Sequence, residues 1–190
     1  MVATVQIIRK TGTAGAEDVS VINDGTTGIN TRANAYDTHS TADTTNPIRI
    51  PAASSNYSYW VSTRLKCTVS PAGTINNVKW FSDGTNSMGT GVTCVGELAS
   101  TGANAGYIQA TGTPGTTGTV LSMANHTGMD AEPTDVFAWT TGSPKTLTAT
   151  ISNPSTGEFG EHFVYQVVVA STASPGVTTS ETFSWRYDET

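Results

Sequence analysis

Three histidines, His39, His126 and His162, are the first residues of this chain that could do chemistry. Histidine is a common zinc ligand and the usual general base near neutral pH. A structural zinc site normally takes its ligands in pairs from short stretches of chain, and these three residues lie far apart in the sequence. We therefore expect solvated or hydrogen-bonded histidines, and we predict no metal and no cofactor for this protein.

A short acidic segment, DAEPTD, carries Asp130, Glu132 and Asp135. Carboxylate oxygens are the ligands that Ca²⁺ prefers in proteins. The segment lacks the ligand spacing of a calcium-binding loop, and Pro133 restricts its backbone. A solvated turn is the simpler interpretation, and calcium binding stays open as the alternative.

Glu158 and Glu161 flank Phe159 and Gly160. Two carboxylates on either side of a sugar bond are the machinery of glycoside hydrolysis. Nothing in the sequence places this pair at the separation that the reaction needs. No nucleophile constellation, phosphate-binding loop or metal-binding motif accompanies them, so we predict a protein that is not an enzyme and has no catalytic residue.

The composition excludes several other classes of function. Charged residues make up 13% of the 190 residues, and nine Lys and Arg stand against fifteen Asp and Glu. Phosphate contacts need clustered cations, so we expect no nucleic acid partner. No apolar run approaches the roughly eighteen residues of a membrane span, and the chain start lacks a signal peptide's apolar core. We expect synthesis in the cytoplasm, without export by the usual route and without a membrane.

The residues named so far must be positioned by strands, because Thr, Gly, Ser and Asn favour strands and turns over helices. The clearest strand is 57–70, in which apolar and polar residues alternate with period two. Trp60 is the exception on its polar face. An exposed indole indicates a contact with a partner; alternatively, residues 24–46 or a second sheet cover it. The inward positions are Tyr57, Tyr59, Val61, Thr63, Leu65, Cys67 and Val69.

The rest of the chain reads as short strands separated by turn residues. With the strand at 57–70 the total is about nine, and none shows a helical period, which predicts an all-β protein built as an antiparallel β-sandwich. The other expected strands are 2–8, 19–23, 48–51, 75–81, 91–98, 146–151, 163–170 and 181–187. Residues 163–170 are apolar almost throughout, as in a central strand buried on both faces.

We divide the chain into an N-terminal part, 1–50, and a sandwich, 51–190. Residues 24–46 are almost entirely polar, with Ile29 and Tyr36 as the apolar exceptions. Such a segment buries too little apolar surface to offset the entropy of its own ordering. We therefore expect an extended arm that another chain orders, with Ile29 and Tyr36 as its anchors.

The sequence Cys67-Thr68-Val69-Ser70, followed by Trp80 thirteen residues after the cysteine, resembles strands B and C of immunoglobulin-like domains. In that family the strand C tryptophan packs over the strand B cysteine, between the two sheets. Tyr165-Gln166-Val167 looks like strand F with its corner tyrosine. Val167 then replaces the family's second cysteine, so Cys67 and Cys94 should be free thiols.

The same resemblance assigns strand E to 147–151 and strand G to 182–187. It implies an Ig-like sandwich with an extended N-terminal arm, without the inter-sheet disulfide. The residues expected in its core are Tyr59, Leu65, Cys67, Trp80, Tyr165, Val167 and Trp185.

A second resemblance is one of overall composition and layout of the chain. Charge-poor, threonine- and glycine-rich all-β chains with long polar loops are similar to virion structural proteins of tailed bacteriophages, including capsid decoration proteins. This implies a particle component, assembled in the host cytoplasm, that binds a protein lattice or its own copies through a flat β-face and the arm. The alternative is a carbohydrate-binding or adhesin-type sandwich that stacks sugars on exposed aromatic residues near Tyr59 and Trp60.

Overall fold

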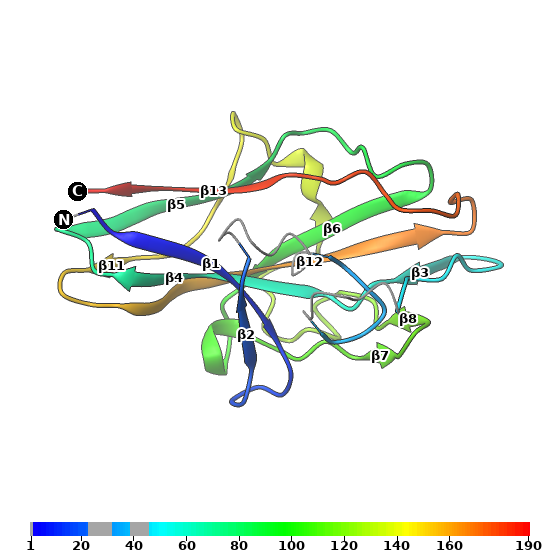
Figure 1. Ribbon diagram of the computed structural model, residues 1–190, viewed down its shortest axis with the longest axis horizontal. Helices are drawn as coiled ribbons and strands as arrows, with labels where there is room; N and C mark the ends of the chain where they lie inside the picture. Colours follow the sequence, from blue (N-terminus) through cyan, green and yellow to red (C-terminus); the bar gives the residue numbers. More distant parts are fainter. Residues whose placement is uncertain (1, 23–31, 39–45) are drawn as a thin grey trace.

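The protein is an elongated β-sandwich in the computed structural model, which describes residues 2–22, 32–38 and 46–190 (Figure 1). The predicted all-β, antiparallel class is confirmed, but the described residues form thirteen strands rather than about nine. The strands are β1 (Thr4–Thr11), β2 (Asp18–Val21), β3 (Ser55–Tyr57), β4 (Val61–Val69), β5 (Thr74–Ser82), β6 (Val92–Ala99), β7 (Gly112–Thr113), β8 (Thr117–Gly118), β9 (Thr134–Asp135), β10 (Lys145–Thr146), β11 (Ile151–Ser152), β12 (Gly157–Ala170) and β13 (Phe183–Glu189).

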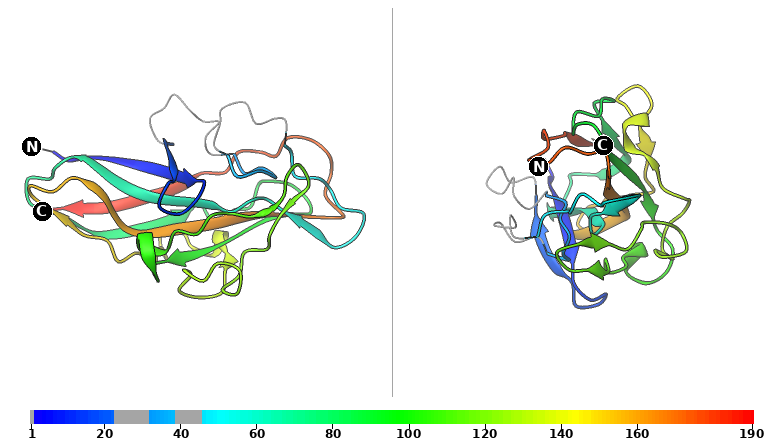
Figure 2. Two further views of the ribbon diagram at one scale, coloured as in Figure 1. Left: turned by 90° about the horizontal axis from the view of Figure 1, so that it is seen from below. Right: turned by 90° about the vertical axis from the view of Figure 1, so that its right-hand side faces the viewer.

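Two antiparallel sheets form the two layers of the sandwich. The large sheet has the order β2-β1-β4-β12-β6-β9, and β3 also pairs with β12. The small sheet has the order β10-β5-β11, and β13 pairs with β5. A separate hairpin, β7-β8, lies on the opposite side of the large sheet from β13 in the end-on view of Figure 2. The helical residues are two short 3₁₀ turns, η1 (Ala103–Gly106) and η2 (Val136–Ala138), and neither could cross a membrane.

The longest strand, β12, is the centre of the large sheet. It pairs with β3 and β4 along one edge and with β6 along the other. The expected continuous strand 57–70 is instead split into β3 and β4. The break has a physical cause, because Tyr59 donates its backbone N–H to the Asn34 carbonyl (2.8 Å) and so leaves the ladder. Within β4 the alternation holds from Val61 to Cys67, with Val61, Leu65 and Cys67 all buried, whereas Val69 at the end of the strand is 36% exposed, contrary to the expectation that it faces inward.

The core between the sheets is built around Trp80. Its ring stacks on Phe163 with centroids 3.7 Å apart and meets the Trp139 ring edge-on at 6.0 Å. Trp80 and Cys67 belong to the same buried cluster, as the Ig-like resemblance implied. The core expectation also holds for Leu65 and Tyr165, whereas Val167 and Trp185 are partly buried at the border of this cluster.

The strand assignments taken from the Ig-like resemblance need correction. In Ig domains strand F lies beside strand C, in the sheet opposite strand B. Here β12 lies beside β4, the strand B equivalent, and the two short strands at 145–152 pair with β5 rather than with β4. The position beside β5 belongs to β13. What remains of the resemblance is that β4 and β5 lie in opposite sheets, with Cys67 and Trp80 between them.

The N-terminal strands belong to the same sandwich. β1 lies between β2 and β4, and its Ile8 is fully buried. The described part of the polar arm, residues 32–38, also packs on its own chain. Ala35 donates its N–H to Asn46 (2.9 Å) and accepts the N–H of Gly115 (2.9 Å). Partner-dependent ordering therefore does not describe residues 32–38, and Ile29 lies outside the described residues.

Cys67 and Cys94 are buried free thiols, as predicted. Cys67 pairs with Gly157 of β12 from one side, and Cys94 pairs with Val167 from the other. Ten residues of an extended strand span about 33 Å, and even a bulged strand leaves far more than the roughly 7 Å that a disulfide tolerates between Cα atoms. The two thiols cannot form a bridge in this fold.

A thiol titration without reductant should therefore find two reactive groups in the denatured protein. In the native protein Cys94 should react very slowly, because burial shields it and raises its pKa far above the usual range. Cys94→Ser is the control, since it should leave one reactive thiol after denaturation. A count of zero in the denatured wild type would contradict the strand order given above.

Candidate functional site

Trp60 is not a partner-binding residue, contrary to one of the two sequence interpretations. Its side chain is 3% exposed and belongs to a second buried cluster on the outer face of the large sheet. The indole N–H donates to the Ile108 carbonyl (3.0 Å), and the ring meets the edge of His126 at 5.3 Å. The described part of 24–46 contributes no residue to this cluster, and neither does the small sheet. The cover is the long connection between β6 and β9, whose apolar residues are the sequence signal that could have shown it.

This connection, residues 100–133, is fixed to the large sheet by Gln166. The side-chain oxygen of Gln166 accepts the Leu121 N–H (2.7 Å), and its amide donates to the carbonyls of Ser58 (2.6 Å) and Thr119 (2.8 Å). Tyr59 lies in the same cluster as Trp60, so it is a core residue of this outer layer rather than of the inter-sheet core. The expectation that 163–170 is buried on both faces is thereby explained.

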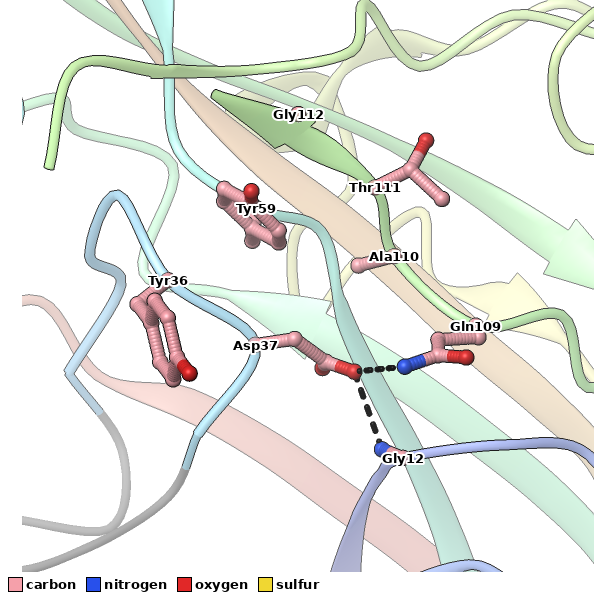
Figure 3. Close-up of a pocket in the computed structure, with 8 residues that line it drawn as sticks. All are labelled: Gly12, Tyr36, Asp37, Tyr59, Gln109, Ala110, Thr111 and Gly112. Carbon is pink, nitrogen blue, oxygen red and sulfur yellow. Dashed lines mark hydrogen bonds between the residues drawn. The ribbon is translucent and has the colours of Figure 1, made fainter. Parts of the chain in front are cut away.

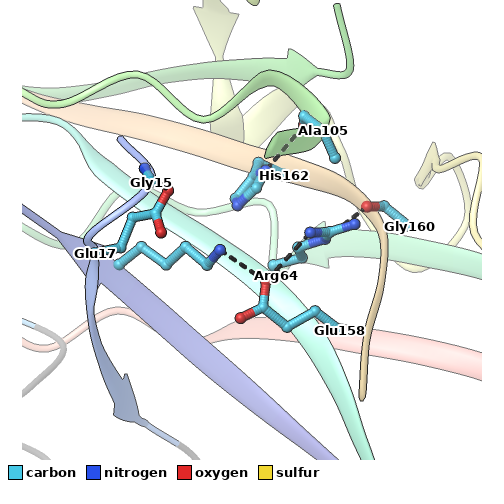
Figure 4. Close-up of polar contacts among 8 residues, drawn as sticks. Gly15, Glu17, Arg64, Ala105, Glu158, Gly160 and His162 are labelled. Carbon is cyan, nitrogen blue, oxygen red and sulfur yellow. Dashed lines mark hydrogen bonds and ion pairs between the residues drawn. The ribbon is translucent and has the colours of Figure 1, made fainter. Parts of the chain in front are cut away.

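His126, which belongs to this connection, and His162, which belongs to β12, are both fully buried. His162 Nδ1 bonds the Ala105 carbonyl at 2.9 Å (Figure 4), while its Nε2 and both ring nitrogens of His126 have no partner among the described residues. Burial lowers the pKa of each imidazole to about 4. Both are therefore neutral at pH 7, and they lie apart, each against its own contacts.

A buried ion cluster lies beside His162 (Figure 4). Lys10 and Arg64 both contact Glu158 Oε2, at 2.7 and 3.2 Å, and Arg64 Nε donates to the Gly160 carbonyl at 2.8 Å. This bond holds the bulge at which β12 shifts register against β4. Burial lowers the pKa of Arg64, and Glu158 opposes that shift. The negative charge of Glu158 is therefore compensated by the positive charges of Lys10 and Arg64.

The second carboxylate of the glycosidase hypothesis, Glu161, accepts the backbone N–H of Thr148 at 2.7 Å. The two carboxylates therefore bind different groups: Glu161 accepts from a backbone N–H, whereas Glu158 pairs with Lys10 and Arg64. The acidic segment behaves similarly: Asp130 accepts from Ser100, Glu132 from the Met123 N–H and Asp135 from the Phe137 N–H. Among the residues that the structure describes, no three His, Cys, Asp or Glu side chains converge as metal ligands.

An apolar cleft of about 1090 Å³ lies between the two sheets. The large sheet lines it with side chains such as Ile7, Tyr165 and Val167, and the small sheet with Trp80 and Trp185. Its rim includes Ile50, which is 38% exposed, and Val177, which is 94% exposed. Two exposed apolar side chains at one opening indicate an interaction surface, from which a bound partner would exclude water.

Strand β13 borders this cleft and has an unpaired edge. Within the described ranges β13 pairs with β5 through a ladder from Phe183 to Glu189, and no described strand pairs with its other edge. The unpaired N–H and C=O groups of an edge strand are a template for another strand. Phe183, Trp185 and Tyr187 face the core side, as the sequence predicts, since all three pack against the inter-sheet cluster.

The chain matches no protein-family model, no curated protein and no solved structure. The features that bear on function are therefore the cleft, the unpaired edge of β13 and the remaining surface of this protein.

Proposed function

We propose that this protein is a non-enzymatic structural component of a virus particle, a capsid decoration protein or another particle-surface protein that binds and stabilises a protein lattice. The observation that carries the proposal is the apolar cleft beside the unpaired edge of β13. An extended segment of a neighbouring chain would hydrogen-bond to that edge and place alternate side chains in the cleft. The charge-poor, threonine-rich composition of the chain supports the same function.

The partner under this proposal is a neighbouring chain of the particle lattice, and the protein resides in the virion after assembly in the host cytoplasm. Each copy would bury more than about 1,000 Å² in total against its neighbours, the size of a specific interface. Small apolar contacts repeated over a lattice add up through multivalency, so each one can be modest.

Changing the rim of the cleft should weaken lattice binding without unfolding the protein. Val177→Asp and Ile50→Asp place a carboxylate at exposed positions, so the isolated variants should melt like wild type. The same carboxylate would be buried unpaired under a docked chain, which should lower binding at least tenfold. The measurement is rebinding to stripped particles of the virus that carries this gene, followed by sedimentation and counting of bound copies.

Val120→Asp is the matched control, because Val120 is 42% exposed and does not line the cleft. It should rebind like wild type. Equal rebinding of all three variants would show that the lattice uses another face. Absence of the wild-type protein from purified particles would overturn the proposed function itself.

A further inference from the structure

A second pocket lies away from the cleft, where four chain segments meet (Figure 3). It has a volume of about 340 Å³ and is lined by Tyr36, Asp37, Tyr59 and Gln109 together with 110–112 and Gly12. The segments come from the turn after β1, the docked residues 32–38, the break before β4 and the connection after β6. A pocket of this size lies at the lower end of the ligand-binding range, enough for one or two small rings.

Two tyrosine rings form the aromatic part of the pocket. Their centroids are 6.4 Å apart and their planes are inclined by 36°. Tyr59 is nearly buried, whereas Tyr36 is 44% exposed although its neighbours Asn34 and Ala35 are buried. A half-exposed ring that directly follows two buried residues offers a rigid apolar face at little cost in conformational entropy.

The polar part of the pocket is already oriented. Asp37 Oδ2 accepts hydrogen bonds from the Gly12 N–H and from Gln109 Nε2, both at 2.9 Å (Figure 3). These bonds fix the planes of the carboxylate and the amide. Asp37 Oδ1 accepts no hydrogen bond from the described residues. Burial, with Asp37 as the next cause, raises the pKa of Tyr59, so its hydroxyl remains a donor at neutral pH.

The support behind these groups is also rigid. The Tyr107 hydroxyl donates to the Gly12 carbonyl (2.7 Å), so Gly12 is held from both its N–H and its C=O. Thr111 shares a hydroxyl–hydroxyl bond of 2.8 Å with Thr119 across the β7-β8 hairpin. A binding site needs such a supporting shell if its polar groups are to meet a ligand without reorganisation.

We infer that this pocket binds a neutral saccharide. A pyranose has apolar C–H faces that pack on aromatic rings and hydroxyls that both donate and accept hydrogen bonds. The pocket offers the matching set: two tyrosine rings, a carboxylate oxygen, an amide and hydroxyl groups. The Asp37 carboxylate disfavours acidic sugars by charge repulsion. A quaternary ammonium would need the aromatic rings and the carboxylate but would leave the donors unpaired, so it fits less well.

The inference does not depend on the proposed lattice function, because no residue that lines this pocket also lines the cleft. Its test is saturation-transfer difference NMR of the full chain at millimolar ligand. The probes are methyl glycosides of glucose, galactose, mannose, fucose and the N-acetylhexosamines, with glucuronic acid and choline as charged comparisons. At least one neutral glycoside should receive saturation, and more strongly than glucuronic acid.

Tyr36→Ala should lower the affinity for that glycoside about tenfold, because it removes the exposed stacking face. Tyr36→Phe should keep most of the affinity, since the ring remains. Gln109→Ala should weaken binding by removing a hydrogen-bonding side chain. Met123→Ala is the control, because Met123 is 42% exposed, similar to Tyr36, but lies outside the pocket. It should bind like wild type.

Three results would overturn the inference: no transfer to any neutral glycoside, affinity unchanged by both Tyr36→Ala and Gln109→Ala, or choline binding that exceeds every glycoside and is lost in Tyr36→Ala. The last would identify an ammonium site. Unchanged melting temperatures of the variants would show that any loss of binding comes from the pocket and not from unfolding.

Discussion

Trp80→Ala should lower the free energy of unfolding by about 3–5 kcal/mol, the largest effect that we expect from a single substitution. Trp80 is almost completely buried, stacks on Phe163 and contacts Trp139 and Phe183 from two other directions. Its removal leaves a cavity between two sheets that cannot close, because both walls are held by hydrogen-bonded ladders. Denaturant unfolding followed by far-UV circular dichroism measures the loss.

Trp80→Phe is the informative comparison. It keeps an aromatic ring against Phe163 and leaves a smaller cavity, so it should cost clearly less than Trp80→Ala. A loss below about 1 kcal/mol for Trp80→Ala is the range of an exposed position. That result would be inconsistent with a tryptophan packed between the sheets.

Acidification should destabilise the contact between the large sheet and its outer layer, because two neutral histidines, His126 of the connection and His162 of β12, are buried. The pKa of His126 and of His162 falls from 6.5 to about 4 on burial. Between these two values the unfolded chain binds more protons than the folded protein, so stability falls as the pH drops from about 6.5 to about 4. Each histidine contributes a loss of about 3 kcal/mol over that window.

The surroundings of the two imidazoles act in different ways. Arg64 and Lys10 lower the pKa of His162 further, while Glu158 and the bond to the Ala105 carbonyl oppose them. His126 faces the ring of Trp60, and burial is the dominant cause of its shift. Carboxylates titrate in part of the same pH range, so the histidine contribution must be isolated by substitution.

His126→Phe provides that isolation, because both ring nitrogens of His126 lack partners in the described structure and a phenyl ring fits the same contact with Trp60. At pH 7 the variant should be as stable as wild type or more stable. Near pH 4 it should exceed wild type by an additional ~3 kcal/mol. Parallel stability curves for the two proteins from pH 7 to pH 4 would refute a buried, neutral His126.

Residues 32–38 connect the two candidate binding regions. Asn34 and the two residues before it line the cleft, while Tyr36 and Asp37 line the second pocket. The segment therefore passes from one region to the other at the buried residue Ala35. A particle-surface protein with both regions would bind its lattice through the cleft and a sugar through the pocket.

Much of the fold could be predicted from the sequence. Period-two alternation from Val61 to Cys67 determined which side chains face the core, because a pleated strand allows only two faces. The apolar run at 163–170 indicated a strand covered on both sides. The resemblance to immunoglobulin-like strands B and C implied that Cys67 and Trp80 share one core, and the structure confirms it.

Strand pairing could not be predicted in the same way. Backbone hydrogen bonds are chemically identical in every strand, so the pattern of 163–170 does not say whether its neighbours are β4 and β6 or β5 and β13. The Ig-like resemblance chose the second, and the structure has the first. The split of the expected strand 57–70 likewise depends on Asn34, which is distant in the sequence and captures the Tyr59 N–H.

The binding regions were decided by tertiary structure almost entirely. Alternation showed that Trp60 lies on the outer face of its sheet, but what covers that face depends on where residues 100–133 fold back. Tyr36 was expected to reach a partner, a prediction that stays untested, and the sequence did not indicate that it lines a pocket with groups from three distant segments. A sequence specifies faces through local periodicity, whereas pockets and covers depend on contacts between segments that no local pattern encodes.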